Sequence, residues 1–245
     1  MKPLSQRQIN LLKAIVEEYT STGEAVGSET IDKKYNLGVS PATIRNEMVR
    51  LEDLGYLKQP HTSAGRIPTP VALKLYVTEL MQEETLPVTE SVAVKERIWD
   101  MRNEINTLLK EATHVLSEKT GNLGVATTDS GQIFSSGYAN ILSIPEFYDI
   151  DTTRVVFSMI ESHRAMAELF AKVAESGSTE PLHIIIGDEF GNEALYPCAF
   201  AYIDFISGNN SGHLGVIGPA RLNYPYVMPM LRHFQVLLNE IGENY

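Results

Sequence analysis

The sequence predicts an α+β protein in which a small helical domain precedes a domain of mixed helices and strands. Three observations predict this class. Helical periodicity dominates the first part of the chain, strand-like apolar segments separated by turns dominate the last part, and the charge changes sign between them. Residues 1–76 carry ten Lys and Arg against eight Asp and Glu, a net charge of +2, whereas the remainder carries ten against 23, a net charge of −13. We expect domains over 1–76 and 119–245, separated by a linker over 77–90 and a long amphipathic helix over 91–118.

The composition indicates a globular chain without disulfides. The chain has 245 residues, a hydrophobic fraction of 43 % and one cysteine, Cys198, so no disulfide can form within it. No apolar run approaches the roughly 20 residues that a helix needs to cross a bilayer. The first residues lead into a charged amphipathic segment and not into the apolar core of a signal peptide. These features predict a cytoplasmic protein.

Two helices are predicted before residue 38. Residues 5–21 have helical periodicity, with Ser5 as the expected N-cap, Gly23 as the expected stop, and an apolar face made by Ile9, Leu12, Ile15, Val16 and Tyr19. A second, shorter helix is expected over 28–35, with Ser28 as its N-cap.

The third helix is predicted to begin after Ser40, because Ser at the N-cap followed by Pro41 at the first helical position is a strong start signal. It should end before Gly55 and bury Ile44, Met48 and Leu51. Its opposite face comprises Ala42, Thr43, Arg45, Asn46, Val49 and Arg50, and it carries hydrogen-bonding and cationic groups near its N-terminal end. Such a face near a helix N-terminus is typical of a recognition helix that enters the major groove of DNA.

A short hairpin is predicted directly after this helix. Residues 56–60 and 66–69 are the expected strands, and small residues at 63–65 form the turn between them. A recognition helix followed by such a hairpin predicts a winged helix-turn-helix. The small turn residues should let the wing lie close to a DNA backbone, with Arg66 supplying charge. The residues expected to contact DNA are Ser28, Ser40, Thr43, Arg45, Asn46, Arg50, Lys58, His61, Thr62, Ser63 and Arg66.

Two segments resemble one known family. GEAVGSETIDKKYNLGVSPATIRNEMVRLEDLGYLKQPHTSAGRIPT, residues 23–69, closely resembles the N-terminal domain of the HrcA family of bacterial heat-inducible transcription repressors. HLGVIGPARLNYPYVMPML, residues 213–231, resembles the C-terminal signature of the same family. The resemblance implies a homodimer bound to an inverted-repeat operator upstream of chaperone genes. It also implies a GAF-like domain interrupted by an inserted dimerising domain, and a GroE-type chaperonin that maintains the active repressor.

The middle of the chain departs from that family pattern. Only a brief turn and a short strand follow the strand expected at 123–128, so we expect the inserted domain to be absent, together with part of the sheet. In the helix over 91–118, a heptad spacing joins Val94, Ile98, Met101, Ile105 and Leu108. This seam is interpreted either as a dimerisation interface or as the face that packs on the chain's own domain. Leu109 and Leu116 widen the stripe toward the second interpretation.

The remainder predicts a reduced GAF-like domain with a central antiparallel sheet and flanking helices. Strands are expected at 123–128, 133–136, 182–187, 198–206 and 213–218, and helices at about 152–175 and 225–241. Residues 208–212 should form a hairpin turn.

No residue pattern indicates catalysis, a metal site or a cofactor. The six histidines lack metal-ligand spacing, Cys198 has no second thiol, and no phosphate-binding loop or nucleophile motif occurs. We therefore expect no enzyme, but a DNA-binding repressor of heat-shock genes. One alternative is a winged-helix regulator that senses a metabolite in its GAF-like domain. The other is a protein-binding adaptor, in which the polar face of the third helix would be solvated surface.

Overall fold

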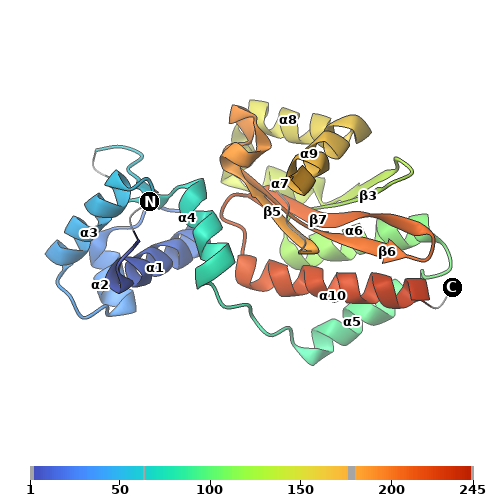
Figure 1. Cartoon of the computed structure of the whole chain (residues 1–245), viewed down its shortest axis with the longest axis horizontal. Helices are drawn as coiled ribbons and strands as arrows, with labels where there is room; N and C mark the ends of the chain where they lie inside the picture. The colour runs from blue at the N-terminus through green and yellow to red at the C-terminus, as the bar shows by residue number, and fades with distance from the viewer. Residues whose placement is uncertain (1–2, 63, 176–179, 244–245) are drawn as a thin grey trace. The chain divides into compact units, whose positions relative to one another are not determined.

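The computed structural model describes residues 3–62, 64–175 and 180–243. The chain divides into two compact units, Met1–Gln82 and Glu83–Tyr245 (Figure 1). Unit 1 is thus slightly longer than the 76 residues expected for the first domain. Among the described residues, no helix combines the length and hydrophobicity needed to cross a bilayer.

Unit 1 contains the predicted three helices and hairpin. The helices are α1 (Gln6–Thr22), α2 (Ser28–Tyr35) and α3 (Pro41–Asp53), and the wing strands are β1 (Leu57–Lys58) and β2 (Ile67–Pro68). Two further segments, α4 (Pro70–Leu75) and the π-helical η1 (Tyr76–Leu80), complete the unit and pack back against α1. The arrangement confirms a winged helix-turn-helix.

Local capping explains where these helices begin. Ser5 forms a capping box with Gln8 at the start of α1, and Gly23 ends that helix in the left-handed region at φ 72°. The Ser40 side chain accepts a hydrogen bond from the Thr43 amide at the start of α3. The expected cap of α2 is wrong, because Gly27 occupies the N-cap and Ser28 is the first helical residue.

Unit 2 is built on one antiparallel sheet of five strands. These are β3 (Leu123–Thr128), β4 (Ile133–Ser136), β5 (Leu182–Ile186), β6 (Cys198–Ser207) and β7 (Asn210–Pro219), in the order β4-β3-β7-β6-β5. Strands β6 and β7 form a long hairpin with Gly208 and Asn209 in a two-residue turn. Gly208 has φ 60°, a value that glycine adopts without strain.

Helices cover both faces of this sheet (Figure 1). One face carries α5 (Val88–Trp99), α6 (Ile105–Thr120) and α10 (Tyr224–Glu243). The other carries α7 (Tyr138–Leu142), η2 (Pro145–Tyr148), α8 (Ile150–Ile160) and α9 (His163–Glu175), together with the turns η3 (Gly187–Phe190) and η4 (Glu193–Leu195). Phe200 and Tyr202 on β6 are buried in the core beneath this second group. The structure confirms the α+β class.

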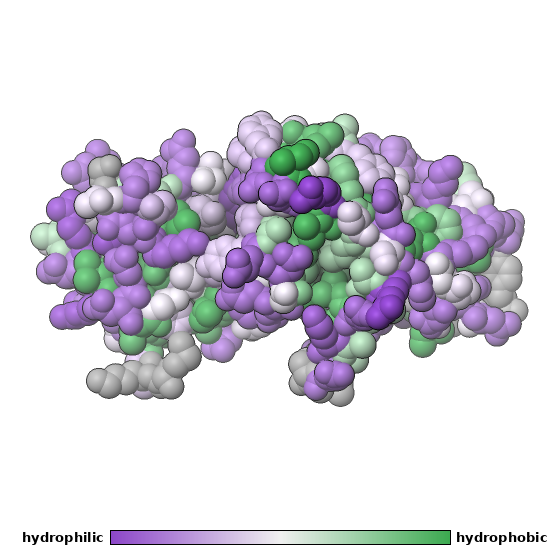
Figure 2. All heavy atoms as spheres, turned by 90° about the horizontal axis from the view of Figure 1, so that it is seen from above, coloured by the Kyte–Doolittle hydropathy of each residue, from purple (hydrophilic) through white to green (hydrophobic). Residues whose placement is uncertain are grey.

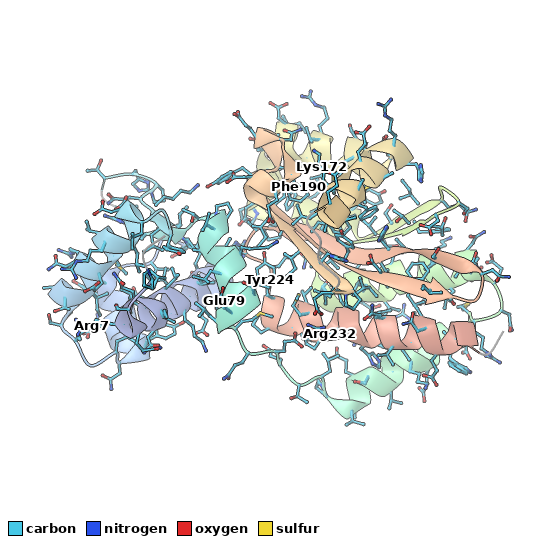
Figure 3. All side chains as sticks on the ribbon, in the orientation of Figure 1. Arg7, Glu79, Lys172, Phe190, Tyr224 and Arg232 are labelled. Carbon is cyan, nitrogen blue, oxygen red and sulfur yellow. The ribbon has the colours of Figure 1, made fainter. Side chains whose placement is uncertain are left out.

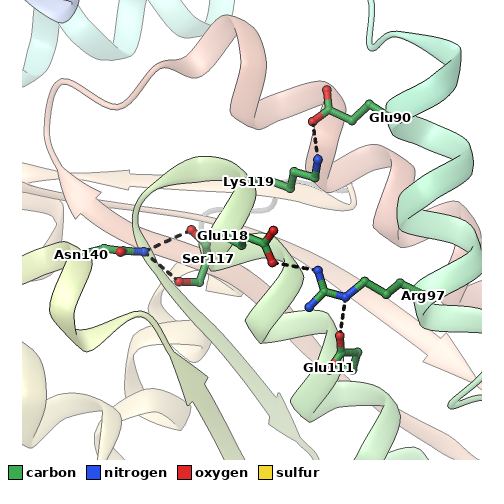
Figure 4. A network of polar contacts seen from close by, with 7 residues as sticks. All are labelled: Glu90, Arg97, Glu111, Ser117, Glu118, Lys119 and Asn140. Carbon is green, nitrogen blue, oxygen red and sulfur yellow. Dashed lines mark hydrogen bonds and ion pairs between the residues drawn. The ribbon is translucent and has the colours of Figure 1, made fainter.

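The single helix predicted over 91–118 is two helices. Residues 100–104 separate α5 from α6, and the Glu104 side chain accepts hydrogen bonds from the first amides of α6. Arg97 on α5 forms ion pairs with Glu111 and Glu118 on α6, with N–O distances of 2.7 and 2.8 Å (Figure 4). These pairs hold α5 folded back along α6.

The helix predicted over 152–175 is also divided. Helix α8 ends at Ile160 and α9 begins at His163, with the Ser162 hydroxyl accepting a hydrogen bond from the Ala165 amide.

The segment that opens unit 2 is held on α10. The Glu84 amide donates to the Pro225 carbonyl, and Arg232, labelled in Figure 3, pairs with Glu83 at 3.3 Å.

A carboxylate joins three strands at one end of the sheet. Asp204 on β6 accepts hydrogen bonds from His183 Nε2 on β5 at 3.0 Å and from His213 Nδ1 on β7 at 2.8 Å. Partial burial raises the pKa of Asp204, but hydrogen bonds and positive charge from the two imidazoles outweigh this and hold the pKa well below its usual range. Because the folded pKa is depressed, this stabilisation is present above the unfolded pKa and is lost as the pH falls through the folded value.

Replacing Asp204 by Asn should lower the free energy of unfolding of unit 2 by about 1 kcal/mol at pH 7, since the carboxylate is half exposed and solvent screens its interactions. Urea unfolding measured from pH 7 to pH 3 should show the difference from wild type shrinking below about pH 4. Asp188→Asn, at an exposed position on η3, is the control. A difference that is unchanged at pH 3 would contradict this role.

Candidate nucleic-acid interface

Helix α3 presents two polar side chains that no described residue engages. Arg45 and Asn46 are exposed, and neither forms a hydrogen bond or ion pair within the described part of the chain. Ile44, Met48 and Leu51 are buried on the opposite face, which fixes the helix on the core of unit 1. An amide and a guanidinium on adjacent exposed positions can form bidentate hydrogen bonds with adenine and guanine, respectively.

The other predicted positions on α3 have partners within the chain. The Thr43 hydroxyl lies 3.0 Å from the Ser40 hydroxyl, so both take part in the helix cap. Arg50 pairs with Glu47 at 2.8 Å, and the second carboxylate oxygen of Glu47 is buried without a partner in the described residues. Arg50 is nevertheless largely exposed, so its guanidinium can contact a phosphate while it retains the ion pair with Glu47.

Gln59 organises the turn of the wing. Its side-chain amide donates to the carbonyls of Thr62 and Ala64 at 3.0 and 2.9 Å, and the Ala64 amide donates to the His61 carbonyl. His61 and Thr62 are exposed on this turn. Sequence reasoning missed Gln59, because nothing in its spacing shows that its side chain turns back on the backbone.

Arg66 lies where the turn of the wing meets β2, and both its side chain and its backbone are engaged within unit 1. Its Nε lies 2.8 Å from a carboxylate oxygen of Glu52 on α3, and only 16 % of its side chain is exposed. Its backbone exchanges two hydrogen bonds with Val26, at 2.9 and 2.8 Å. Arg66 therefore ties the wing to α3 and to the loop before α2.

Position 65 requires glycine for a reason that differs from the predicted one. A Cβ at this position would overlap the carbonyl of Val26, so glycine is required for the wing to approach the loop before α2. The prediction assigned the small turn residues to close approach of DNA. Ser63, the first of them, lies outside the described residues.

Replacing Gly65 by Ala should displace the wing, because the new methyl group meets backbone atoms that cannot rotate away. We expect a loss of roughly 1–3 kcal/mol in the stability of unit 1, as for an overpacked core. DNA affinity should fall roughly tenfold, which corresponds to about 1.4 kcal/mol. Thermal unfolding and fluorescence anisotropy with labelled duplex measure the two effects. Val71→Ala, on the exposed side of α4, is the control, and equal affinities for the two variants would contradict the role of Gly65.

One hollow brings several predicted residues together. It has a volume of about 420 Å³ and lies between the start of α2, the exposed side of α3 and the wing. Its lining includes Ser28, Arg45, Thr62 and Arg66 from the predicted set, and also Gln59. The first amides of α2 lie at one side of it, where a helix N-terminus favours an anion such as a phosphate. Ser40 and Lys58 do not line this hollow.

Comparison with known proteins decides the family. Residues 3–82 match the family described as winged helix-turn-helix transcription repressor, HrcA DNA-binding, and residues 72–228 match the HrcA protein C terminal domain. The chain belongs to the HrcA family. This is a family of transcription repressors and not of enzymes. Among the described residues, no group of three or more His, Cys, Asp and Glu side chains could hold a metal ion.

Relatives from the HrcA family match either nearly the whole chain or about half of it. The heat-inducible transcription repressor HrcA of Symbiobacterium thermophilum is 30 % identical over 340 residues, covering 98 % of this chain and 99 % of the relative. The protein of the same name from Clostridioides difficile is 48 % identical over 127 residues, 52 % of this chain and 38 % of the relative. A crystal structure described only as a hypothetical protein shares the fold, with a TM-score of 0.73, 18 % identity and 98 % coverage of both chains.

The length of the first alignment shows what this member of the HrcA family lacks. It spans 340 positions, whereas this chain has 245 residues, so at least 95 positions of the alignment have no residue here. Because both ends match, the missing positions are internal.

The predicted dimerisation seam is not an exposed surface. Val94, Ile98 and Leu108 are buried within one chain, Ile105 is half-buried, and Met101 is exposed in the turn between α5 and α6. The break at residues 100–104 interrupts the heptad spacing, so the five residues do not form one stripe. Within the described residues this segment packs on its own domain, as the alternative interpretation expects.

Proposed function

We propose that the protein represses transcription of heat-shock chaperone genes by binding an inverted-repeat operator as a homodimer. The observation that carries the proposal is the exposed Arg45–Asn46 pair on α3, which has no partner among the described residues. Arg45 also lines the hollow beside the wing. The names of the relatives, heat-inducible transcription repressors, support the class of gene. Bound at a promoter, such a dimer would block RNA polymerase.

Each side chain at this surface has a chemical role in the proposal. Asn46 reads an adenine and Arg45 reads a guanine through two hydrogen bonds each. The amides at the start of α2, beside Ser28, hold a phosphate that enters the hollow, and Arg50 holds a neighbouring one. Thr43 and Ser40 orient the start of α3 through their shared cap. On the wing, Lys58, His61 and Thr62 contact the DNA backbone, while Arg66 positions the wing through Glu52.

The charge distribution supports docking by unit 1 alone. Residues 1–76 have a net charge of +2 and the remainder has −13, so the larger part of the protein repels DNA. This repulsion weakens non-specific binding and leaves the recognition surface as the point of contact. We also infer from the family resemblance that a GroE-type chaperonin maintains the active repressor. Addition of purified chaperonin to heat-inactivated protein should then restore operator binding.

Footprinting tests the function directly. Purified full-length protein should protect an inverted repeat in the regions upstream of chaperone genes in its own genome. Half-sites centred about 10 base pairs or a multiple apart would match two-fold docking of two winged helices. Protection of no region, or of DNA irrespective of sequence, would exclude the repressor function and leave the protein-binding adaptor.

A second candidate function is metabolite sensing by unit 2. A hollow of about 550 Å³ lies between α8, α9 and the turns η3 and η4, with Met159, Leu169 and Phe190 among its lining residues. Its volume is within the range of small-molecule sites. A thermal-shift screen with metabolites tests this candidate. A compound that stabilises unit 2 and changes operator affinity would support sensing, whereas stabilisation without such a change would not.

A further inference from the structure

Unit 2 exposes a group of large apolar side chains on one connected segment. Tyr138 and Leu142 lie one turn apart on α7, Tyr148 lies in η2, and Ile150 begins α8, with exposed fractions of 41, 53, 69 and 74 %. We call these four residues the α7–α8 patch. Figure 2 looks onto the side of this unit that bears α8 and α9 and shows hydrophobic residues at the surface between polar ones.

Internal contacts hold the α7–α8 patch together. The Tyr138 ring packs edge-on against Phe157 of α8, with ring centroids 5.2 Å apart. The Tyr148 hydroxyl donates to the Ser143 carbonyl at 3.4 Å, which joins η2 to the end of α7. The two tyrosine side chains are thus held in place on this surface, so binding to it would cost little additional ordering of them.

We propose that the α7–α8 patch is the surface through which two copies of this chain associate. The inference rests on the proposed function, because an inverted repeat requires two winged helices related by a two-fold axis. Contiguous exposed apolar side chains mark interaction surfaces, and tyrosine is enriched in the centres of interfaces. Of the seam predicted on α5 and α6, Val94, Ile98 and Leu108 are buried within one chain and are not available to a second copy.

Local charges favour a second copy as the occupant. Each carboxylate beside the patch has a partner within its own chain: Glu146 is bound by Arg221 at 2.5 and 3.0 Å, Asp149 caps α8, and Asp151 pairs with Arg154 at 2.7 Å. Two arginines offset two of these three carboxylates, so the patch carries little net charge in a unit that is otherwise strongly acidic, and repulsion between two copies is weak here.

The Asp151–Arg154 pair also makes the edge of the patch self-complementary. Both side chains are well exposed on the first turns of α8, next to Ile150. When two identical surfaces meet about a two-fold axis, residue i of one copy faces residue j of the other and the reverse contact also forms. Asp151 of each copy can then meet Arg154 of the other, in exchange for the pair within one helix.

Sedimentation of the full-length chain tests the proposal. Wild-type protein should sediment with twice the mass of one chain. Ile150→Asp and Leu142→Asp should each raise the dimer dissociation constant at least about a hundredfold, because each places two charges in the centre of a symmetric interface. Both residues are mostly exposed in one chain, so neither change removes a core contact, and circular dichroism verifies that the variants fold. Ile206→Asp, whose wild-type side chain on β6 is 67 % exposed, is the matched control and should leave the constant unchanged.

The same samples are titrated with a duplex that carries one half-site. All variants should bind it like wild type, since unit 1 is unaltered, and only the patch variants should lose the tighter binding to the full inverted repeat. A monomeric wild-type chain at concentrations that saturate the operator would overturn the proposal, and so would equal dissociation constants for Ile150→Asp and Ile206→Asp. If no variant binds DNA while the masses differ as expected, the proposed function fails and the interface stands.

Discussion

The substitutions Asn46→Ala and Arg45→Ala should each weaken binding to the operator by about 1–3 kcal/mol, which is roughly a 5- to 150-fold loss of affinity. Both side chains are exposed on α3 and have no partner in the described part of the chain, so each is available to read a base. The change should remove discrimination at one base pair in each half-site and leave binding to unrelated DNA nearly as before. Fluorescence anisotropy with the operator and with single-base variants measures this.

Arg50→Ala is the comparison for that experiment. Arg50 is also exposed on α3 but pairs with Glu47, and we assign it to phosphate. Its loss should weaken binding to all sequences to a similar degree and reduce the salt dependence of binding. If Asn46→Ala and Arg45→Ala also weaken binding to all sequences equally, α3 contacts the DNA phosphate backbone and does not read the base sequence.

Replacing Phe200 by Ala should lower the free energy of unfolding of unit 2 by about 3–5 kcal/mol, since it leaves a cavity in the centre of the core. Phe200 is 1 % exposed, and its ring lies 4.9 Å from that of Tyr202 and 6.0 Å from that of Phe170. The melting temperature of the unit should fall by roughly 10 °C. Differential scanning calorimetry measures it, with Val236→Ala at an exposed position of α10 as control.

The Phe200 variant also tests how heat acts. If loss of structure in unit 2 separates the two copies and releases DNA, a reporter gene under the operator should be derepressed at a lower temperature in the variant. Half-site binding by unit 1 should be unaffected below that temperature. Derepression at the wild-type temperature, despite a lower melting temperature, would place the heat response outside unit 2.

Features set by local chemistry were predictable from the sequence. Ser40 followed by Pro41 marks the start of α3, and the spacing of Ile44, Met48 and Leu51 marks its buried face, because capping and helical periodicity involve residues close in the chain. For the same reason the sequence predicted the β6–β7 hairpin, although the observed strands are longer and the turn is shorter than expected.

Features set by contacts between distant residues were not predictable. The two helix breaks were missed for a different, local reason. Apolar periodicity continues through residues 100–104 and through Glu161 and Ser162, and it was given more weight than the capping residues Glu104 and Ser162. Glu52 and Arg66 are 14 positions apart, and their ion pair exists only because the wing folds against α3. The close approach of Gly65 to Val26 likewise depends on tertiary packing, and so the small turn residues were assigned to DNA.

The ratio of specific to non-specific affinity tests most directly whether unit 1 reads an operator. The full-length protein is titrated at physiological salt with the footprinted inverted repeat and with a duplex of the same length and composition in scrambled order. We predict that the operator binds at least about a thousandfold more tightly. Equal affinities for the two duplexes would contradict sequence recognition by α3.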